Sequence, residues 1–179
     1  MEVLRKIFFI FRLMKNKKIV FKKLDKIDVL IFGSTPVRLR FKKQIKVLQI
    51  IDEVYFQLLI FAIIKLIISK KKNNFRELND IYFKLLINTL MPKVSIGNEV
   101  NANIFKLKRF FPDKITIAYQ RVHWKNYLKS SLHEMVKKDF SCDYFFVFDK
   151  NAKKHLNYIK TKFIIAGSVS NNEVLTNKQ

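Results

Sequence analysis

Glycine, proline and cysteine are scarce in this chain of 179 residues, which has three glycines, three prolines and a single cysteine. One cysteine excludes a disulfide framework within the chain, and this fits a reducing compartment. Cys142 comes just before an apolar run, so we expect a buried, inert thiol and not a nucleophile. Because the three histidines are scattered and offer none of the usual zinc spacings, no metal site is predicted.

The scarcity of glycine also excludes the glycine-rich phosphate-binding motifs. Gly33 follows an apolar run, but the second and third glycines of a dinucleotide fingerprint are absent. The Gly-Lys-Ser/Thr end of a P-loop and the Gly-x-Ser-x-Gly elbow of serine hydrolases are absent as well. A glycine directly after a strand still suits a tight turn with positive φ, which we expect at Gly33.

Long apolar runs are missing too. The most hydrophobic stretch, 54–68, contains Gln57 and Lys65, whereas a membrane-spanning helix needs about 20 apolar residues. We therefore expect 54–68 to form a buried or membrane-surface helix, opened by the acidic pair Asp52-Glu53. The apolar run 7–11 is too short for the core of a secretory signal and has no cleavage site after it.

Acidic residues are few: Asp and Glu number 14 against 36 Lys and Arg, which gives a formal net charge of +22. Such a charge favours anionic partners, namely nucleic acid, phosphorylated sugars or an anionic membrane surface. The heavy use of Lys, Ile, Phe and Asn offers another explanation, in which lysine is simply the default surface residue. Nucleic-acid binding is not favoured, because most Phe residues fall on expected core positions and no RNA-binding motif is present.

Short helices alternate with short apolar runs through the second half of the chain. Amphipathic helices are expected over 80–90 and 101–111, each ended by a proline, and a longer polar helix over 125–138. Strands are expected at 27–32, 46–51, 93–96, 115–119, 140–148 and 161–166. Such alternation is typical of βαβ units. The predicted fold is therefore α/β: a Rossmann-like parallel sheet of five or six strands with flanking helices, in a single domain.

The ends of the chain differ in composition from this domain. Residues 1–26 alternate basic and apolar residues, which is typical of an amphipathic arm on an anionic membrane. A helix or an extra edge strand packed against the domain explains the same pattern. The predicted organisation is a basic arm over 1–26, the Rossmann-like domain over 27–168, and a polar tail over 169–179.

Polar residues stand where the expected strands end. Because right-handed crossovers bring the carboxyl ends of parallel strands to one edge, where open α/β sheets bind ligands, we expect these residues to lie together. The candidates for substrate binding are Gly33, Ser34, Thr35, Asn98, Gln120 and Arg121, and those for catalysis are Glu99 and His123.

These candidates differ in the chemistry they would supply. Arg121 would neutralise a phosphate, and His123 or Glu99 would act as the base for an acceptor hydroxyl. The two candidate bases have simpler structural explanations: His123 as a loop histidine satisfied by the backbone, and Glu99 as a charge that complements the start of the next helix. Asp149 is explained as the cap of a short helix, and Asn79 or Asp80 as the cap of the helix over 80–90.

A family resemblance rests on short segments in a fixed order. They are Met91-Pro92-Lys93-Val94, Phe105-Lys106-Leu107-Lys108, Phe111-Pro112-Asp113-Lys114, Ile117-Ala118-Tyr119-Gln120, Asp143-Tyr144-Phe145-Phe146-Val147-Phe148, Gly167-Ser168 and Asn171-Asn172. With them the chain resembles the surface carbohydrate (polysaccharide) biosynthesis proteins, which are similar to GT-B glycosyltransferases and to glycerophosphotransferases.

The resemblance implies the N-terminal, acceptor-side half of a GT-B glycosyltransferase. Such a domain would work in the cytoplasm, peripherally at the inner face of the cell membrane, on a lipid-linked acceptor. The resemblance implies no cofactor on this chain, and a nucleotide-activated sugar on a donor-binding half supplied by a separate chain. Two alternatives stay open: a non-catalytic basic domain that binds an anionic membrane surface or a protein partner, and a nucleic-acid-binding protein.

Overall fold

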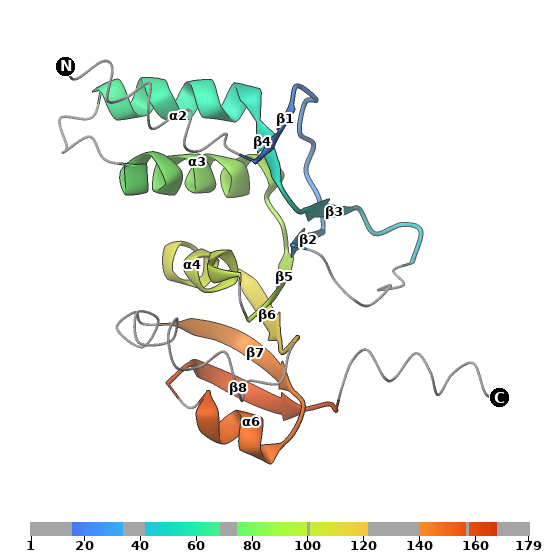
Figure 1. The fold of residues 1–179 in the computed structure, drawn as a ribbon. Helices are drawn as coiled ribbons and strands as arrows, with labels where there is room; N and C mark the ends of the chain where they lie inside the picture. Colours follow the sequence, from blue (N-terminus) through green and yellow to red (C-terminus); the bar gives the residue numbers. More distant parts are fainter. Residues whose placement is uncertain are drawn as a thin grey trace. The chain divides into compact units, whose positions relative to one another are not determined.

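The computed structural model of the chain describes residues 16–33, 42–68, 75–99, 101–121, 140–156 and 158–167. The described residues divide into two units (Figure 1). Unit 1 takes those of Met1–Lys26 and Ile51–Met91, and unit 2 takes those of Ile27–Ile50 and Pro92–Gln179. The domain boundaries at 26 and 168 stay a prediction.

Unit 2 contains a six-stranded sheet in which every neighbouring pair of strands is parallel. Its strands are β2 (Val29–Phe32), β3 (Val47–Ile50), β5 (Val94–Asn98), β6 (Ile115–Tyr119), β7 (Ser141–Val147) and β8 (Lys160–Ile165). Together with the helices that pack on it, this sheet confirms the predicted Rossmann-like α/β fold. All six strands were expected from the sequence, with bounds that differ by a few residues.

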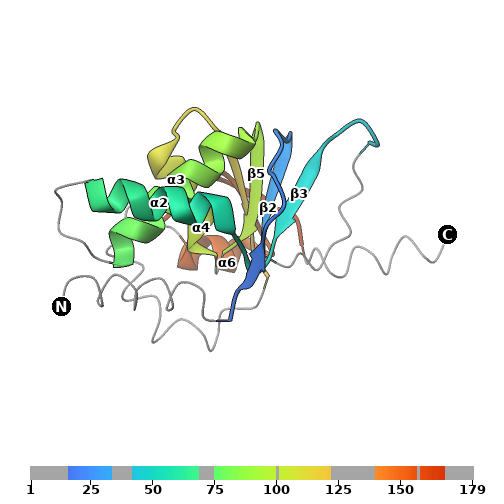
Figure 2. The same cartoon turned by 90° about the horizontal axis from the view of Figure 1, so that it is seen from above.

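The strand order locates the point where the winding of the sheet reverses. The order is β3-β2-β5-β6-β7-β8, and Figure 2 shows β3, β2 and β5 lying side by side. If the six strands are numbered in chain order, the sheet order is 2-1-3-4-5-6. Strand β2, the first in the chain, therefore lies between β3 and β5. The topological switch point therefore lies between β2 and β5.

Helix α4 (Ala102–Phe110) covers part of one face of this sheet and packs against β5, β6 and β7. It buries Ile104, Phe105 and Leu107, and the Phe105 ring lies 4.8 Å from that of Phe140. Gly97 allows this close approach, because a β carbon there would lie 3.2 Å from Cβ of Ile104. The helix predicted over 101–111 is therefore confirmed, with the bounds Ala102–Phe110, and its apolar side faces the sheet.

Side-chain caps begin the two helices, α4 and α6, that the described residues of unit 2 form. The Asn101 side chain accepts a hydrogen bond from the backbone N–H of Asn103 at 3.1 Å and begins α4. Asp149 begins α6 (Lys150–His155) in the same way, since its Oδ1 accepts from the N–H of Ala152 at 2.7 Å. The predicted capping role of Asp149 is confirmed. Such caps satisfy backbone donors that the first helical turn leaves without partners.

The described residues of unit 1 form two strands and two helices. Strand β1 (Lys18–Val20) pairs in parallel with β4 (Glu53–Tyr55), and α2 (Phe56–Ile68) follows β4 directly. Helices α2 and α3 (Phe75–Leu90) pack against each other, as Figure 1 shows. The Tyr82 hydroxyl on α3 accepts a hydrogen bond from the backbone N–H of Tyr55 at 2.9 Å, which ties α3 to the start of α2.

Unit 1 departs from the sequence prediction in two places. The helix expected over 54–68 begins only at Phe56, because the residues before it pair with β1. The acidic pair therefore does not open the helix: Asp52 forms an ion pair with Lys17 at 2.6 Å, and Glu53 accepts from the Tyr55 hydroxyl. Helix α3 starts at Phe75 and not near residue 80, so Asn79 and Asp80 lie inside it and neither is its N-cap. The buried Leu78 extends its apolar side toward the N-terminus.

Two predicted elements lie outside the described residues: the helix expected over 125–138, and residues 1–15 of the basic arm. Of the arm, the described part contains β1, which is a strand paired with β4.

Candidate functional site

The carboxyl edge of the sheet in unit 2 brings together five of the eight candidate residues. Gly33 follows β2. Asn98 is the last residue of β5 and Glu99 follows it, and Gln120 and Arg121 follow β6. Since β2, β5 and β6 are consecutive neighbours in the sheet, these residues form one continuous corner region. Ser34, Thr35 and His123 lie outside the described residues.

Gly33 makes the turn that the sequence predicted. Its φ is +80°, in the left-handed region that favours glycine. Its N–H donates to the Ile50 carbonyl at 2.7 Å, and its own carbonyl accepts from Nε2 of Gln49 at 2.9 Å. A β carbon at Gly33 would lie 3.4 Å from Nδ2 of Asn101 and 3.7 Å from Nδ2 of Asn98. Two side-chain amides therefore border the space that a side chain at Gly33 would occupy, at the switch point.

Asn98 connects this turn to the start of α4. It is only 5% exposed, and its Oδ1 accepts a hydrogen bond from the backbone N–H of Asn101 at 3.0 Å. Its side chain also hydrogen-bonds to the Tyr119 hydroxyl on the neighbouring strand β6. Burial, followed by the negative charge of Glu99, raises the pKa of Tyr119, so this phenol stays protonated around neutral pH.

Glu99 and Gln120 hold the next two corners through backbone donors. Glu99 is 3% exposed, and its Oε2 accepts from the N–H of Arg121 at 2.8 Å. Gln120 is 2% exposed, and its Oε1 accepts from the N–H of Phe148 at 3.0 Å. Each side chain thus reaches to the end of the following strand of the sheet. The Arg121 side chain, by contrast, is exposed.

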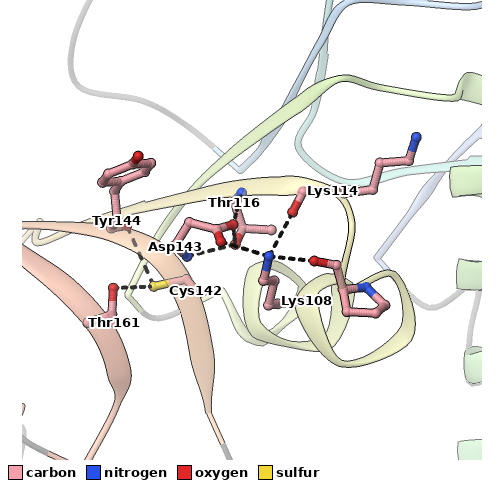
Figure 3. A network of polar contacts seen from close by, with 8 residues as sticks. Lys108, Lys114, Thr116, Cys142, Asp143, Tyr144 and Thr161 are labelled. Carbon is pink, nitrogen blue, oxygen red and sulfur yellow. Dashed lines mark hydrogen bonds and ion pairs between the residues drawn. The ribbon is translucent and has the colours of Figure 1, made fainter.

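A second polar cluster lies near the amino ends of β6 and β7, and Figure 3 shows it from close by. Nζ of Lys108, in the last turn of α4, lies 2.7 Å from Oδ1 of Asp143. Oδ2 of Asp143 accepts from the backbone N–H of Thr116 at 2.8 Å and from its hydroxyl at 3.0 Å. Lys108 also donates to the Pro112 and Lys114 carbonyls, so it holds the turn that leads from α4 into β6.

The charge of Asp143 is stabilised inside this cluster. Partial burial raises the pKa of the Asp143 carboxyl, but hydrogen bonds from Lys108 and from Thr116 lower it more, and the pKa lies below its ordinary value. Neither Asp143 nor Lys108 was singled out as an interacting residue from the sequence. The sequence feature that could have indicated this pair is a lysine near a helix C-terminus. This feature is common and does not identify the residue with which the lysine pairs.

Cys142 precedes Asp143 and points into the core. It is 4% exposed, and burial raises the pKa of its thiol to about 11. Its Sγ lies 3.3 Å from Oγ1 of Thr161 (Figure 3). The predicted buried thiol is confirmed, and a protonated thiol is a poor nucleophile.

In the part of the chain that the structure describes, no three His, Cys, Asp or Glu side chains gather as ligands for a metal ion. No helix of the same described ranges is long and apolar enough to cross a membrane.

Comparison with known proteins found no family model that matches the chain, and no matching curated protein or solved structure. The α/β fold with a parallel sheet is shown by the structure itself. The resemblance to surface carbohydrate biosynthesis proteins stays a prediction.

Proposed function

We propose that the chain is the acceptor-side domain of a glycosyltransferase in surface polysaccharide biosynthesis, and that it binds a phosphate-bearing, lipid-linked acceptor. The observation that carries the proposal is the position of Gly33 opposite the amides of Asn98 and Asn101, at the carboxyl ends of β2 and β5. Open α/β sheets bind their ligands at such a switch point.

The groups at this edge suit a phosphate. Gly33 has no β carbon, so a ligand can approach its backbone. The start of α4 carries the positive end of a helix dipole, which favours an anion. The exposed Arg121 side chain adds a full positive charge and can bind two phosphate oxygens at once. These features support a phosphorylated acceptor over a neutral sugar.

The burial of Glu99 decides which of the two candidate residues, Glu99 or His123, we assign as the base. Its carboxylate is 3% exposed and receives the N–H of Arg121, which favours a role in positioning Arg121. We therefore assign the base to His123. It would take the proton of the acceptor hydroxyl while the hydroxyl oxygen attacks the anomeric carbon of a nucleotide-activated sugar, and the nucleotide would leave with the electron pair. A donor-binding half on a separate chain would hold that nucleotide sugar.

The test is calorimetric titration of the full chain with a short-chain polyprenyl phosphate, and with the matching polyprenol, which lacks the phosphate. We expect binding of the phosphate compound only. Arg121→Gln and Gly33→Val should each weaken it by about tenfold or more, because each removes or blocks a contact to a charged group.

Lys93→Gln is the matched control. It also removes one positive charge, but Lys93 lies at the opposite edge of the sheet, where it pairs with Asp28. Equal weakening by Lys93→Gln and Arg121→Gln would mean that net charge alone attracts the ligand. Equal binding of the polyprenol would refute the phosphate site.

A further inference from the structure

Helix α2 of unit 1 has apolar residues on its exposed side as well as on its buried side. The buried side consists of Leu58, Leu59, Ala62 and Leu66. The exposed side carries six large apolar side chains with exposed fractions between 36% and 74%. We call these six residues the outer face: Phe56, Ile60, Phe61, Ile64, Ile67 and Ile68.

The outer face is continuous along the helix. Ile60, Ile64 and Ile67 follow one another at intervals of four and three residues, which keeps them on the same side. Gln57 and Lys65 are the polar exposed residues of α2. Because the packing of α2 on α3 uses the opposite side, the outer face contributes little to the core of unit 1. A soluble monomer rarely exposes so large a contiguous apolar patch without a partner for it.

A basic segment adjoins the outer face. Phe21, which is 69% exposed, follows β1, and its ring lies 5.0 Å from that of Phe56 at the start of α2. Lys22 and Lys23 come directly after Phe21 and are exposed. Residues 16–26 contain five lysines against a single acidic residue, Asp25. Apolar side chains and lysines thus occur together on unit 1.

We propose that the outer face, with Phe21, Lys22 and Lys23, docks on an anionic lipid bilayer. Helix α2 would lie in the plane of the interface with its isoleucines and phenylalanines below the headgroups. The lysines would contact anionic lipid headgroups, while their aliphatic stems lie along the apolar layer.

Charge decides between a bilayer and a second copy of the chain as the occupant of this surface. Two copies would each bring a net charge of +22 to the contact, which opposes their association. An anionic bilayer has the complementary charge and also accepts apolar side chains. The inference does not rest on the proposed acceptor site, since it uses only residues of unit 1.

Co-sedimentation with vesicles tests the docking surface. The full chain is mixed with vesicles of phosphatidylcholine and phosphatidylglycerol in equal parts, or of phosphatidylcholine alone, and we expect tighter binding to the anionic vesicles. The variant Phe61→Ser/Ile64→Ser/Ile68→Ser should lower the partition coefficient about tenfold or more. Its control, Ile115→Ser/Ile165→Ser, replaces exposed apolar residues of unit 2 and should bind like wild type.

A second pair of variants tests the lysines. Lys22→Gln/Lys23→Gln should lower binding to anionic vesicles by roughly fivefold for each lysine removed. The control Lys42→Gln/Lys43→Gln removes an adjacent, exposed lysine pair from unit 2 and should have a clearly smaller effect. Equal losses in the two variants would mean that total charge drives binding, which would overturn the lysine contacts proposed here.

Insertion of α2 can be observed without destabilising variants. Phe61→Trp in a Trp124→Phe background places a single tryptophan on the outer face, and brominated lipids should quench its fluorescence. Absence of quenching, or wild-type binding by the folded serine variant, would overturn the proposal. So would a dimer in gel filtration that the serine variant converts to a monomer. Because the vesicles contain no polyprenyl phosphate, these results are independent of the acceptor site.

Discussion

The two edges of the sheet in unit 2 use polar residues in different ways. At the amino edge, acidic and basic side chains pair with each other: Asp143 with Lys108, and Asp28 with Lys93. At the carboxyl edge, Glu99 and Gln120 accept hydrogen bonds from backbone N–H groups and so hold the corners between strands. The difference indicates that the amino edge serves stability, whereas the carboxyl edge fixes the shape of a corner region next to the Gly33 turn.

The largest expected effect breaks the amino-edge cluster. Asp143→Ala removes the acceptor of three hydrogen bonds, from Lys108 and from the N–H and hydroxyl of Thr116. We expect the free energy of unfolding to fall by about 3 kcal/mol, with solvent screening of the partly exposed ion pair taken into account. Denaturant titration measures it. Asp113→Ala, at a 74% exposed carboxylate, is the control, and an equal loss there would contradict the cluster's role.

The pH dependence sharpens the same point. Because the pKa of Asp143 is lowered in the folded state, its contribution to stability is complete above the ordinary carboxyl pKa of about 4. That contribution is lost as the pH falls through the lowered pKa of the folded state. The difference in unfolding free energy between wild type and Asp143→Asn should therefore be constant near neutral pH and shrink below about pH 4. A difference that grows on acidification would reverse the assigned sign.

A smaller effect is expected at the carboxyl edge. Gln120→Ala leaves the N–H of Phe148 without the Gln120 acceptor in a buried place, so the unfolding free energy should fall by about 1–2 kcal/mol. Gln49→Ala is the control, because the bond that Gln49 donates to the Gly33 carbonyl is exposed to water. If the two substitutions had equal effects, Gln120 would not be what holds the corner between β6 and β7.

The smallest expected effect is the difference in stability that the two ion pairs of the amino edge contribute. Lys93 is 79% exposed in its pair with Asp28, whereas Lys108 is 19% exposed in its pair with Asp143. Lys93→Gln should leave the midpoint of thermal unfolding unchanged within error, while Lys108→Gln should lower it measurably. Equal shifts would show that burial does not decide the value of these pairs.

Local patterns predicted much of this structure. The strand over 115–119, the Gly33 turn, the Asp149 cap and the buried Cys142 follow from short apolar runs and from the preferences of single residues. Patterns of this range do not reveal pairing partners far apart in the chain. Val54 and Tyr55 of the strand Glu53–Tyr55 were therefore predicted to be helical, since the partner strand Lys18–Val20 lies more than thirty residues away.

Part of the candidate site was also predicted from the sequence. Its residues were chosen because they end or follow predicted strands, and the parallel sheet places these strands next to one another: Gly33, Asn98, Glu99, Gln120 and Arg121. The approach of Asn101 to Gly33 was not predicted, because it depends on the order in which β2 and β5 stand in the sheet.

By itself, the sequence determined the fold class, the positions of most strands and the excess of positive charge, since these depend on composition and on periodicity within a few residues. Only the tertiary structure decided which residues meet. It paired Lys108 with Asp143 across 35 positions and put the switch point between β2 and β5. It also decided which side of α2 is buried, because large apolar residues occur all around this helix, and its two polar residues, Gln57 and Lys65, are too few to define its inner face.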